Sequence, residues 1–231
     1  MARRTLPSFK TLWNRHKNLY LEVFSIALEK LTKKNPISGD EDAISERLCP
    51  ILSCVCFDFL KSRNIEVPIP KLEGPIQPKN EAELTGGKKR KRPDFTCNYL
   101  NRLANSHEEY EISFHVECKR LGKPTSPGWI LNENYVKNGI KRFDSKAHEY
   151  GKRSPSGMMI GYITGMSPKE IETEVNGYQE KYLPDYTNIT FTFDDEKVSR
   201  ARQAIERRSV CPEQFELIHL WADLRDNYRS N

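Results

Sequence analysis

The segment from Glu111 to Lys119 alternates regularly between apolar and polar residues. Successive side chains of a β-strand point to opposite faces of the sheet, so this alternation predicts a strand. Its apolar face comprises Ile112, Phe114, Val116 and Cys118. Glu117 and Lys119 lie together on the other face, separated by one pleat. The segment therefore requires a sheet, and it places a carboxylate beside an ammonium group.

A second alternating segment, residues 95 to 100, precedes this strand and predicts its antiparallel partner across a long connection. Pro93 marks the entry to that segment and Asp94 follows it directly. Asp94 would lie beside Glu117 if the connection brings the two strand ends into register. A shorter alternating run, residues 65 to 69, predicts another strand closed by prolines.

Apolar residues at helical spacing predict a helix over residues 8–34, and a second helix from about residue 40 to 63 with a kink or restart at Pro50. Ser38 to Glu41 fits a capping box. Ser126-Pro127-Gly128 opens a helix running to residue 150, followed by a buried strand over 157–164. Beyond it we expect a helix (168–182), a strand (189–193), a helix (194–208) and a strand (215–224).

This order predicts one α/β domain over residues 1–231, with a central mixed β-sheet flanked by helices. Its core, αβββαβ, covers about residues 40–164, preceded by the helix 8–34 and followed by a C-terminal α/β extension over 165–231. The 231 residues can bury such a core without disulfide or metal staples.

Lys plus Arg number 37 against 32 Asp plus Glu, so the net charge is +5, which permits a polyanionic partner without requiring one. The six cysteines fall mostly within apolar runs and are expected to be reduced and buried. No apolar stretch approaches bilayer length, and no leader is recognisable. We therefore expect a soluble cytoplasmic protein without a membrane partner.

Two converging carboxylates and an ammonium group suit metal-assisted hydrolysis of a phosphodiester. Mg²⁺ is held by a few carboxylate oxygens and keeps waters for the substrate. The ion polarises the phosphoryl group, and a lysine positions the attacking water or stabilises developing charge. Asp94 and Glu117 are the candidate metal ligands, Lys119 the assisting cation, and the backbone carbonyl of Cys118 a further oxygen ligand.

Pro93-Asp94 followed by Glu117-Cys118-Lys119 resembles the motif of the PD-(D/E)XK nuclease superfamily. The order of elements across residues 40–164 is similar to that family's restriction-endonuclease-like core. The resemblance implies a Mg²⁺-dependent endonuclease, in which Mn²⁺ would substitute, acting on double-stranded DNA as a restriction or anti-phage defence enzyme. A single site cuts one strand, so the resemblance also implies a homodimer or a companion subunit. The alternative is a catalytically silent relative that binds nucleic acid or a partner protein.

The family often adds an acidic residue from its first core helix. On a helical wheel Glu41 falls on the side of Leu48 and Leu52, which faces the core, whereas Glu46 falls on the opposite side. Glu41 is therefore the favoured catalytic and metal-binding acid, although it could equally cap its helix. Because Pro50 could shift the phase of the helix, the choice between Glu41 and Glu46 stays open.

A basic run leads directly into Pro93-Asp94 and would meet a phosphate backbone approaching the site. Lys141 and Arg142 could extend this DNA-binding face from the following helix. The alternatives for the run are a solvated loop or a nuclear-localisation signal. The run consists of Lys88, Lys89, Arg90, Lys91 and Arg92.

Overall fold

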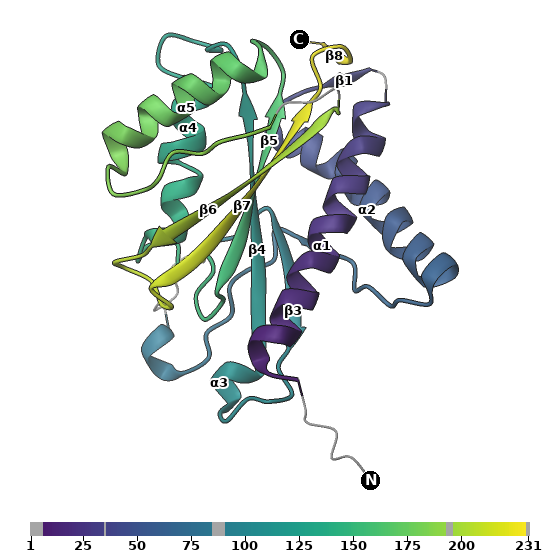
Figure 1. The fold of residues 1–231 in the computed structure, drawn as a ribbon, viewed down its shortest axis with the longest axis vertical. Coiled ribbons are helices and arrows are strands. Elements are labelled where there is room, and N and C mark those ends of the chain that lie inside the picture. The colour runs from purple at the N-terminus through teal and green to yellow at the C-terminus, as the bar shows by residue number, and fades with distance from the viewer. Residues whose placement is uncertain (1–6, 35, 85–90, 193–195, 230–231) are drawn as a thin grey trace.

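The computed structural model describes residues 7–34, 36–84, 91–192 and 196–229. A six-stranded mixed sheet, in the order β2-β3-β4-β5-β7-β6, forms its centre (Figure 1). β4, β5 and β7 run parallel in the middle, while β2, β3 and β6 are antiparallel to their neighbours. The strands are β2 (Lys71–Leu72), β3 (Phe95–Leu100), β4 (Glu111–Leu121), β5 (Ser156–Ile163), β6 (Val198–Glu206) and β7 (Gln214–Asp223).

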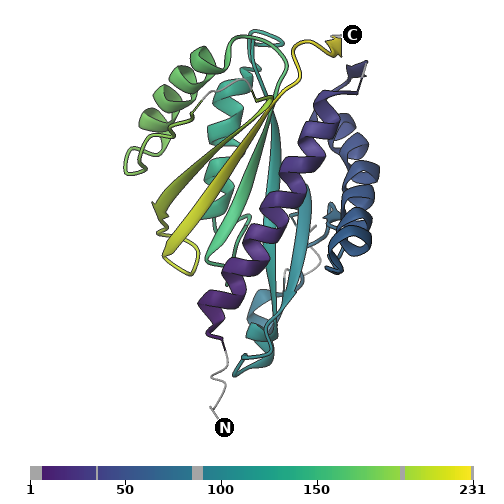
Figure 2. The same cartoon turned by 45° about the vertical axis from the view of Figure 1, so that its right-hand side comes forward.

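Helices cover both faces of this sheet (Figures 1 and 2). α1 (Phe9–Thr32) and α2 (Glu41–Arg63) cover one face, and their buried residues join the apolar face of β4 in one core cluster. α4 (Leu131–Lys137) and α5 (Pro168–Tyr182) cover the other face, where a second cluster includes Met159 and Trp221. The prediction of an α/β protein with a mixed, helix-flanked sheet is confirmed.

The remaining elements are short and lie at the ends of the sheet. The 3-10 helix η1 (Glu81–Glu83) and helix α3 (His107–Tyr110) precede β3 and β4 respectively, and the 3-10 helix η2 (Ile140–Asp144) follows α4. β1 (Ile37–Ser38), between α1 and α2, pairs in parallel with the C-terminal strand β8 (Tyr228–Arg229). Among the described residues, no helix has the length and apolarity needed to cross a membrane.

α2 begins two residues later than a capping box at Ser38 would have it. Its N-cap is Asp40, whose carboxylate accepts a hydrogen bond from the Ala43 N–H at 3.1 Å. The helix continues through Pro50 without a break, so the predicted restart there is wrong. The helical phase between Glu41 and the buried Leu48 is therefore kept.

Two predicted elements before β5 are wrong. Residues 65–69 do not pair, and β2 begins only at Lys71, because Pro68 and Pro70 lack the N–H that a ladder needs. The single helix predicted over 126–150 is instead α4 and η2, separated by Gly139. A Cβ at Gly139 would lie 2.3 Å from the Tyr135 carbonyl oxygen, so the chain turns sharply out of the helix there.

The C-terminal extension is partly as predicted. α5 occupies residues 168–182 as expected, with Ser167 and Glu170 forming a capping box. The predicted helix over 194–208 is wrong: residues 193–195 lie outside the described part, and Val198–Glu206 forms β6, paired with β7. The run is rich in Ala, Arg, Gln and Glu, which favour helices, but pairing with β7 overrides that local preference. No strand is assigned over the described residues 189–192.

The register of β3 and β4 creates the feature on which the site depends. The pairing ends where Phe95, the first residue of β3, lies opposite Val116. β4 continues for a further five residues, Glu117 to Leu121, which pair only with β5. One edge of this part of β4 is thus left without a neighbouring strand, and Asp94 lies at its start.

Candidate metal-dependent active site

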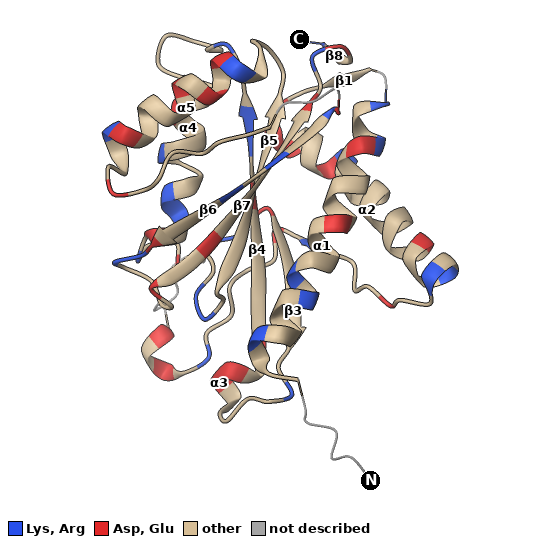
Figure 3. Cartoon of the chain, viewed as in Figure 1, with Lys and Arg blue, Asp and Glu red and all other residues tan. Residues whose placement is uncertain are grey.

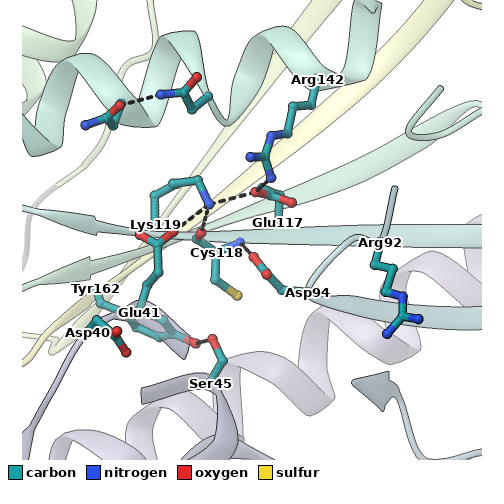
Figure 4. Close-up of polar contacts among 12 residues, drawn as sticks. Asp40, Glu41, Ser45, Arg92, Asp94, Glu117, Cys118, Lys119, Arg142 and Tyr162 are labelled. Atoms are coloured by element: carbon teal, nitrogen blue, oxygen red, sulfur yellow. Dashed lines mark hydrogen bonds and ion pairs between the residues drawn. The ribbon is translucent and has the colours of Figure 1, made fainter. Parts of the chain in front are cut away.

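The unpaired edge of β4 at Cys118 is satisfied by side chains instead of by a strand. The Asp94 carboxylate accepts a hydrogen bond from the Cys118 N–H at 2.5 Å. The Lys119 ammonium group donates to the Cys118 carbonyl oxygen at 2.7 Å. Figure 4 shows Glu41, Asp94 and Lys119 meeting around this residue. The strand offset therefore brings together the residues that the sequence motif predicted.

Glu117 lies on the opposite face from Cys118 and is fully buried. Its Oε1 contacts the Lys119 Nζ at 2.7 Å and the Arg142 guanidinium. Its Oε2 is also buried but has no hydrogen-bond partner among the described residues. Neighbouring β5 carries no charged residue (Figure 3). Burial, followed by the nearby Asp94, raises the pKa of Glu117 to about 8, against the opposing effect of the two cations.

Asp94 is fixed by its backbone as well as by its side chain. Its carbonyl oxygen accepts a hydrogen bond from the Glu73 N–H at 2.9 Å. Two residues earlier in the chain, the Tyr150 hydroxyl donates to the Arg92 carbonyl oxygen at 2.7 Å. Burial raises the pKa of Asp94 to about 6, which Lys119 and the Cys118 N–H partly offset. The site thus keeps two carboxylates in an environment that disfavours their charge.

Lys119 uses all the hydrogen bonds that its ammonium group can donate. Its three acceptors are the Cys118 carbonyl, Glu117 Oε1 at 2.7 Å and Glu41 Oε1 at 2.9 Å. Burial lowers the pKa of Lys119, but Glu117, Asp94 and Glu41 together raise it well above its ordinary value. Lys119 therefore remains protonated and acts as a hydrogen-bond donor and positive charge, not as a base.

The structure also places the two candidate helix acids. Glu41, in the first turn of α2, reaches Lys119 and is partly exposed, with 28% of its side chain accessible. Glu46 is exposed on the outer side of the same helix. Glu41 is thus part of the cluster, and Glu46 lies away from it.

When Glu117 is ionised, three carboxylates face two cations in this cluster, and it then carries one uncompensated negative charge. Within the described ranges, however, no group of three or more His, Cys, Asp or Glu side chains is arranged to hold a metal ion. Glu41 is bound to Lys119, and the Cys118 carbonyl predicted as a ligand accepts the Lys119 hydrogen bond instead. Asp94 and the unpartnered Oε2 of Glu117 are the donors that fit a divalent cation, which would keep its other ligands as water.

The motif did not identify three other residues of the site. Arg142, expected on a DNA-binding face, binds Glu117 from η2. Below Cys118, Tyr162 and Ser45 share a buried hydrogen bond of 3.1 Å between their hydroxyl groups. The one available signal was a tyrosine in the otherwise apolar strand 157–164, since a buried hydroxyl needs a partner.

The remaining predicted residues lie outside this cluster. Lys88, Lys89 and Arg90 fall outside the described residues, while Lys91, Arg92 and Lys141 are exposed. His115 shares the face of Glu117 but is buried, and burial lowers its pKa to about 4. Its Nδ1 accepts a hydrogen bond from the Gly151 N–H at 3.0 Å, which is a structural role.

No family model, no curated protein and no solved structure matches the chain.

Proposed function

We propose that this chain is a divalent-metal-dependent endonuclease that hydrolyses phosphodiester bonds in DNA, with Asp94, Glu117 and Lys119 at its centre. The observation that carries the proposal is the fully buried Glu117 carboxylate, of which one oxygen has two cationic partners and the other has none among the described residues. A buried carboxylate oxygen without a partner is costly unless a ligand satisfies it.

Asp94 and Glu117 would hold Mg²⁺, which supplies Lewis acidity at the phosphoryl group and acidifies a bound water. The residues of the chain contribute position and charge. The Cys118 N–H fixes the Asp94 carboxylate, and Arg142 and Lys119 fix Oε1 of Glu117. Lys119 Nζ supplies positive charge where negative charge would develop on the phosphate oxygens.

A phosphate oxygen can bind Lys119 only if one of its three acceptors gives way. Glu117 is fully buried and the Cys118 carbonyl belongs to the sheet, whereas Glu41 is partly exposed at the start of a helix. Glu41 is therefore the acceptor most easily replaced by substrate. In this role it keeps Lys119 oriented before the DNA binds, and it is then free to turn to the metal.

The test is to incubate the purified protein with supercoiled plasmid, linear duplex and single-stranded DNA, with Mg²⁺ and with EDTA. The wild type should cut only with Mg²⁺, whereas Glu117→Ala should not cut but should still fold and bind DNA. Glu46→Gln is the matched control, since it changes an exposed glutamate on the same helix as Glu41. Cleavage by Glu117→Ala at the wild-type rate would remove this site from the reaction.

A binding-only relative is the second candidate, and one observation favours it: Lys119 and Arg142 both pair with one oxygen of Glu117, so protein cations alone can balance that carboxylate. Thermal unfolding distinguishes the two, because a ligand that binds only the native state stabilises it by about 2.7 kcal/mol at a hundredfold excess over Kd. A rise in Tm with Mg²⁺ that is lost in Asp94→Asn supports the enzyme. An unchanged Tm supports a protein that only binds.

A further inference from the structure

A cavity lies at the carboxyl end of β4, close to the candidate active site. It has a volume of about 500 Å³ and is lined by Asp40, Arg120 and Lys123, among others. Asp40 and Arg120 directly adjoin Glu41 and Lys119 in the chain. The cavity therefore shares the start of α2 and the end of β4 with the Lys119 cluster.

The charged groups of the cavity favour an anion. Asp40 is its one acidic lining residue in the described part of the chain, and its carboxylate caps α2. Arg120 donates from Nη1 to the Tyr228 hydroxyl at 3.2 Å, and that hydroxyl donates to the Gly39 carbonyl at 2.8 Å. The Nε of Arg120 is buried and has no partner among the described residues. A guanidinium held through one nitrogen keeps further N–H groups for a phosphate oxygen.

The loop after β4 carries an exposed aromatic residue close to this cavity. The Thr125 N–H donates to the Trp129 carbonyl at 3.2 Å, and the Trp129 N–H donates to the Ser126 carbonyl at 3.0 Å. Thr125 itself lines the cavity. Trp129 is 49% exposed, whereas the other two tryptophans, Trp13 and Trp221, are 2% and 1% exposed. A large aromatic surface left in water, on a residue hydrogen-bonded to the cavity-lining Thr125, offers a stacking platform.

We infer that this cavity and Trp129 bind an unpaired nucleotide of the DNA strand, with its phosphate on Arg120 and Lys123 and its base stacked on Trp129. The inference rests on the proposed nuclease function and specifies its substrate. A base can stack on a protein side chain only where its face is free, as in a single strand, a fork or a flipped nucleotide. The substrate would therefore be DNA with an unpaired segment beside the cut, and not an uninterrupted duplex.

Binding can be measured in EDTA, so that no DNA is cut. Because Trp13 and Trp221 are buried, quenching of tryptophan fluorescence by oligothymidylate would report on Trp129. We expect strong quenching by oligothymidylate and little by a blunt duplex of equal length. No quenching by either DNA would overturn the inference.

Variants are compared by the anisotropy of labelled oligothymidylate. Trp129→Ala should weaken binding about 5- to 150-fold, the range for one stacked base, and Trp129→Phe should restore most of it. Arg120→Gln and Lys123→Gln should each lower the slope of log K against log salt by about 0.7. If Arg120→Gln lowers Tm, Arg120→Lys keeps the charge and should retain the slope.

The matched controls lie on the exposed side of α2. Phe57→Ala removes an aromatic residue that is 57% exposed, and Lys61→Gln removes an exposed cation. Neither should change the affinity. Equal affinity of Trp129→Ala and wild type would overturn the inference, and so would a loss of the same size in Phe57→Ala.

Failure of this inference can be told apart from failure of the nuclease proposal. A protein that cuts duplex DNA with Mg²⁺, with KM unchanged in Trp129→Ala, remains a nuclease without this subsite. A protein that binds oligothymidylate through Trp129 but never cuts keeps the subsite and loses the nuclease assignment.

Discussion

Two buried polar clusters lie on the same side of the sheet, and they are satisfied in different ways. Around His219 the groups form a chain: Trp221 Nε1 donates to the Tyr135 hydroxyl at 3.1 Å, and that hydroxyl meets His219 Nδ1 at 2.8 Å. His219 Nε2 meets the Gln203 side-chain oxygen at 3.3 Å, and Gln203 donates to Gln179 at 2.8 Å. Burial lowers the pKa of His219 to about 3, so the whole chain is neutral.

The cluster around Glu117 is charged, and one of its buried oxygens has no partner in the described part of the chain. Two of its members, Glu41 and Arg142, reach solvent. A neutral network in which every polar group is hydrogen-bonded favours one arrangement of the core. A charged network with an unsatisfied group lowers the stability of the fold, and a bound ligand can offset that loss. Burial alone therefore does not distinguish the two clusters, whereas the unpartnered carboxylate oxygen and the charged groups do.

The largest expected effect is on activity at Glu117. Glu117→Gln should reduce Mg²⁺-dependent cleavage by at least about 100-fold. Even mutation of residues that only hydrogen-bond to metal ligands lowers metal affinity or activity by about 10- to 100-fold. Its Tm at pH 7 should stay near that of the wild type, because protonated Glu and Gln are both neutral. Cleavage rates and thermal unfolding of the same preparation check both. Cleavage at the wild-type rate would show that Glu117, like His219, has only a structural role.

His219→Phe should show the reverse pattern. It leaves the Tyr135 hydroxyl and the Gln203 side chain without their central partner, which should lower the free energy of unfolding by about 1–3 kcal/mol. Cleavage at a temperature where the variant is folded should stay near the wild-type rate. Denaturant unfolding measures the loss in free energy of unfolding. A large loss of cleavage in the folded variant would break the separation between the two clusters.

The two clusters should also respond to pH with opposite signs. The fold raises the pKa of Glu117 from 4.5 to about 8, so stability present at pH 4.5 is lost as the pH rises to about 8. It lowers the pKa of His219 from 6.5 to about 3, so stability present at pH 6.5 is lost as the pH falls.

The free energy of unfolding, measured without metal from pH 4.5 to 8.5 for the wild type and each variant, separates these two pH dependences. The fall in stability towards high pH should be smaller in Glu117→Gln, and the fall towards low pH should be smaller in His219→Phe. Mg²⁺ should restore stability at the upper end, because metal binds the ionised carboxylates. An equal fall towards high pH in Glu117→Gln and wild type would contradict the assignment to this carboxylate.

The smallest effects concern the two helix acids. Glu41→Gln keeps a hydrogen-bond acceptor for Lys119 but removes a charge, so cleavage should fall and the Mg²⁺ concentration for half-maximal activity should rise about 10-fold. Glu46→Gln should be silent, within about 0.5 kcal/mol in stability. Metal titrations of cleavage compare the two. A lower Tm with an unchanged metal requirement in Glu41→Gln would limit Glu41 to a structural role.

The sequence predicted those parts of the molecule in which the local pattern and the tertiary context agree. The alternation over 111–119 gave both the strand and its faces, because an apolar stripe of period two has one stable arrangement. The motif selected Asp94, Glu117 and Lys119, which the fold brings together. The helical wheel separated Glu41 from Glu46 correctly because Pro50 does not interrupt α2.

The rest depended on contacts between distant residues. β6 has the composition of a helix and becomes a strand only because β7 offers it a partner. Arg142 reaches Glu117 because Gly139 ends α4 and turns the chain, a geometry that helical periodicity cannot reveal. The unpartnered oxygen of Glu117 is likewise a property of the packed site and not of the motif.

The unequal lengths of β3 and β4 also affect the tendency of the protein to self-associate at high concentration. An open stretch of strand is a template on which another chain can add, and proteins block it with charges or covering segments. At Cys118 the Asp94 carboxylate and the Lys119 ammonium group occupy the N–H and the C=O that an incoming strand would use. The residues proposed for catalysis therefore also block the backbone groups through which another chain could pair with β4. Variants that neutralise both of them should be judged for aggregation as well as for activity.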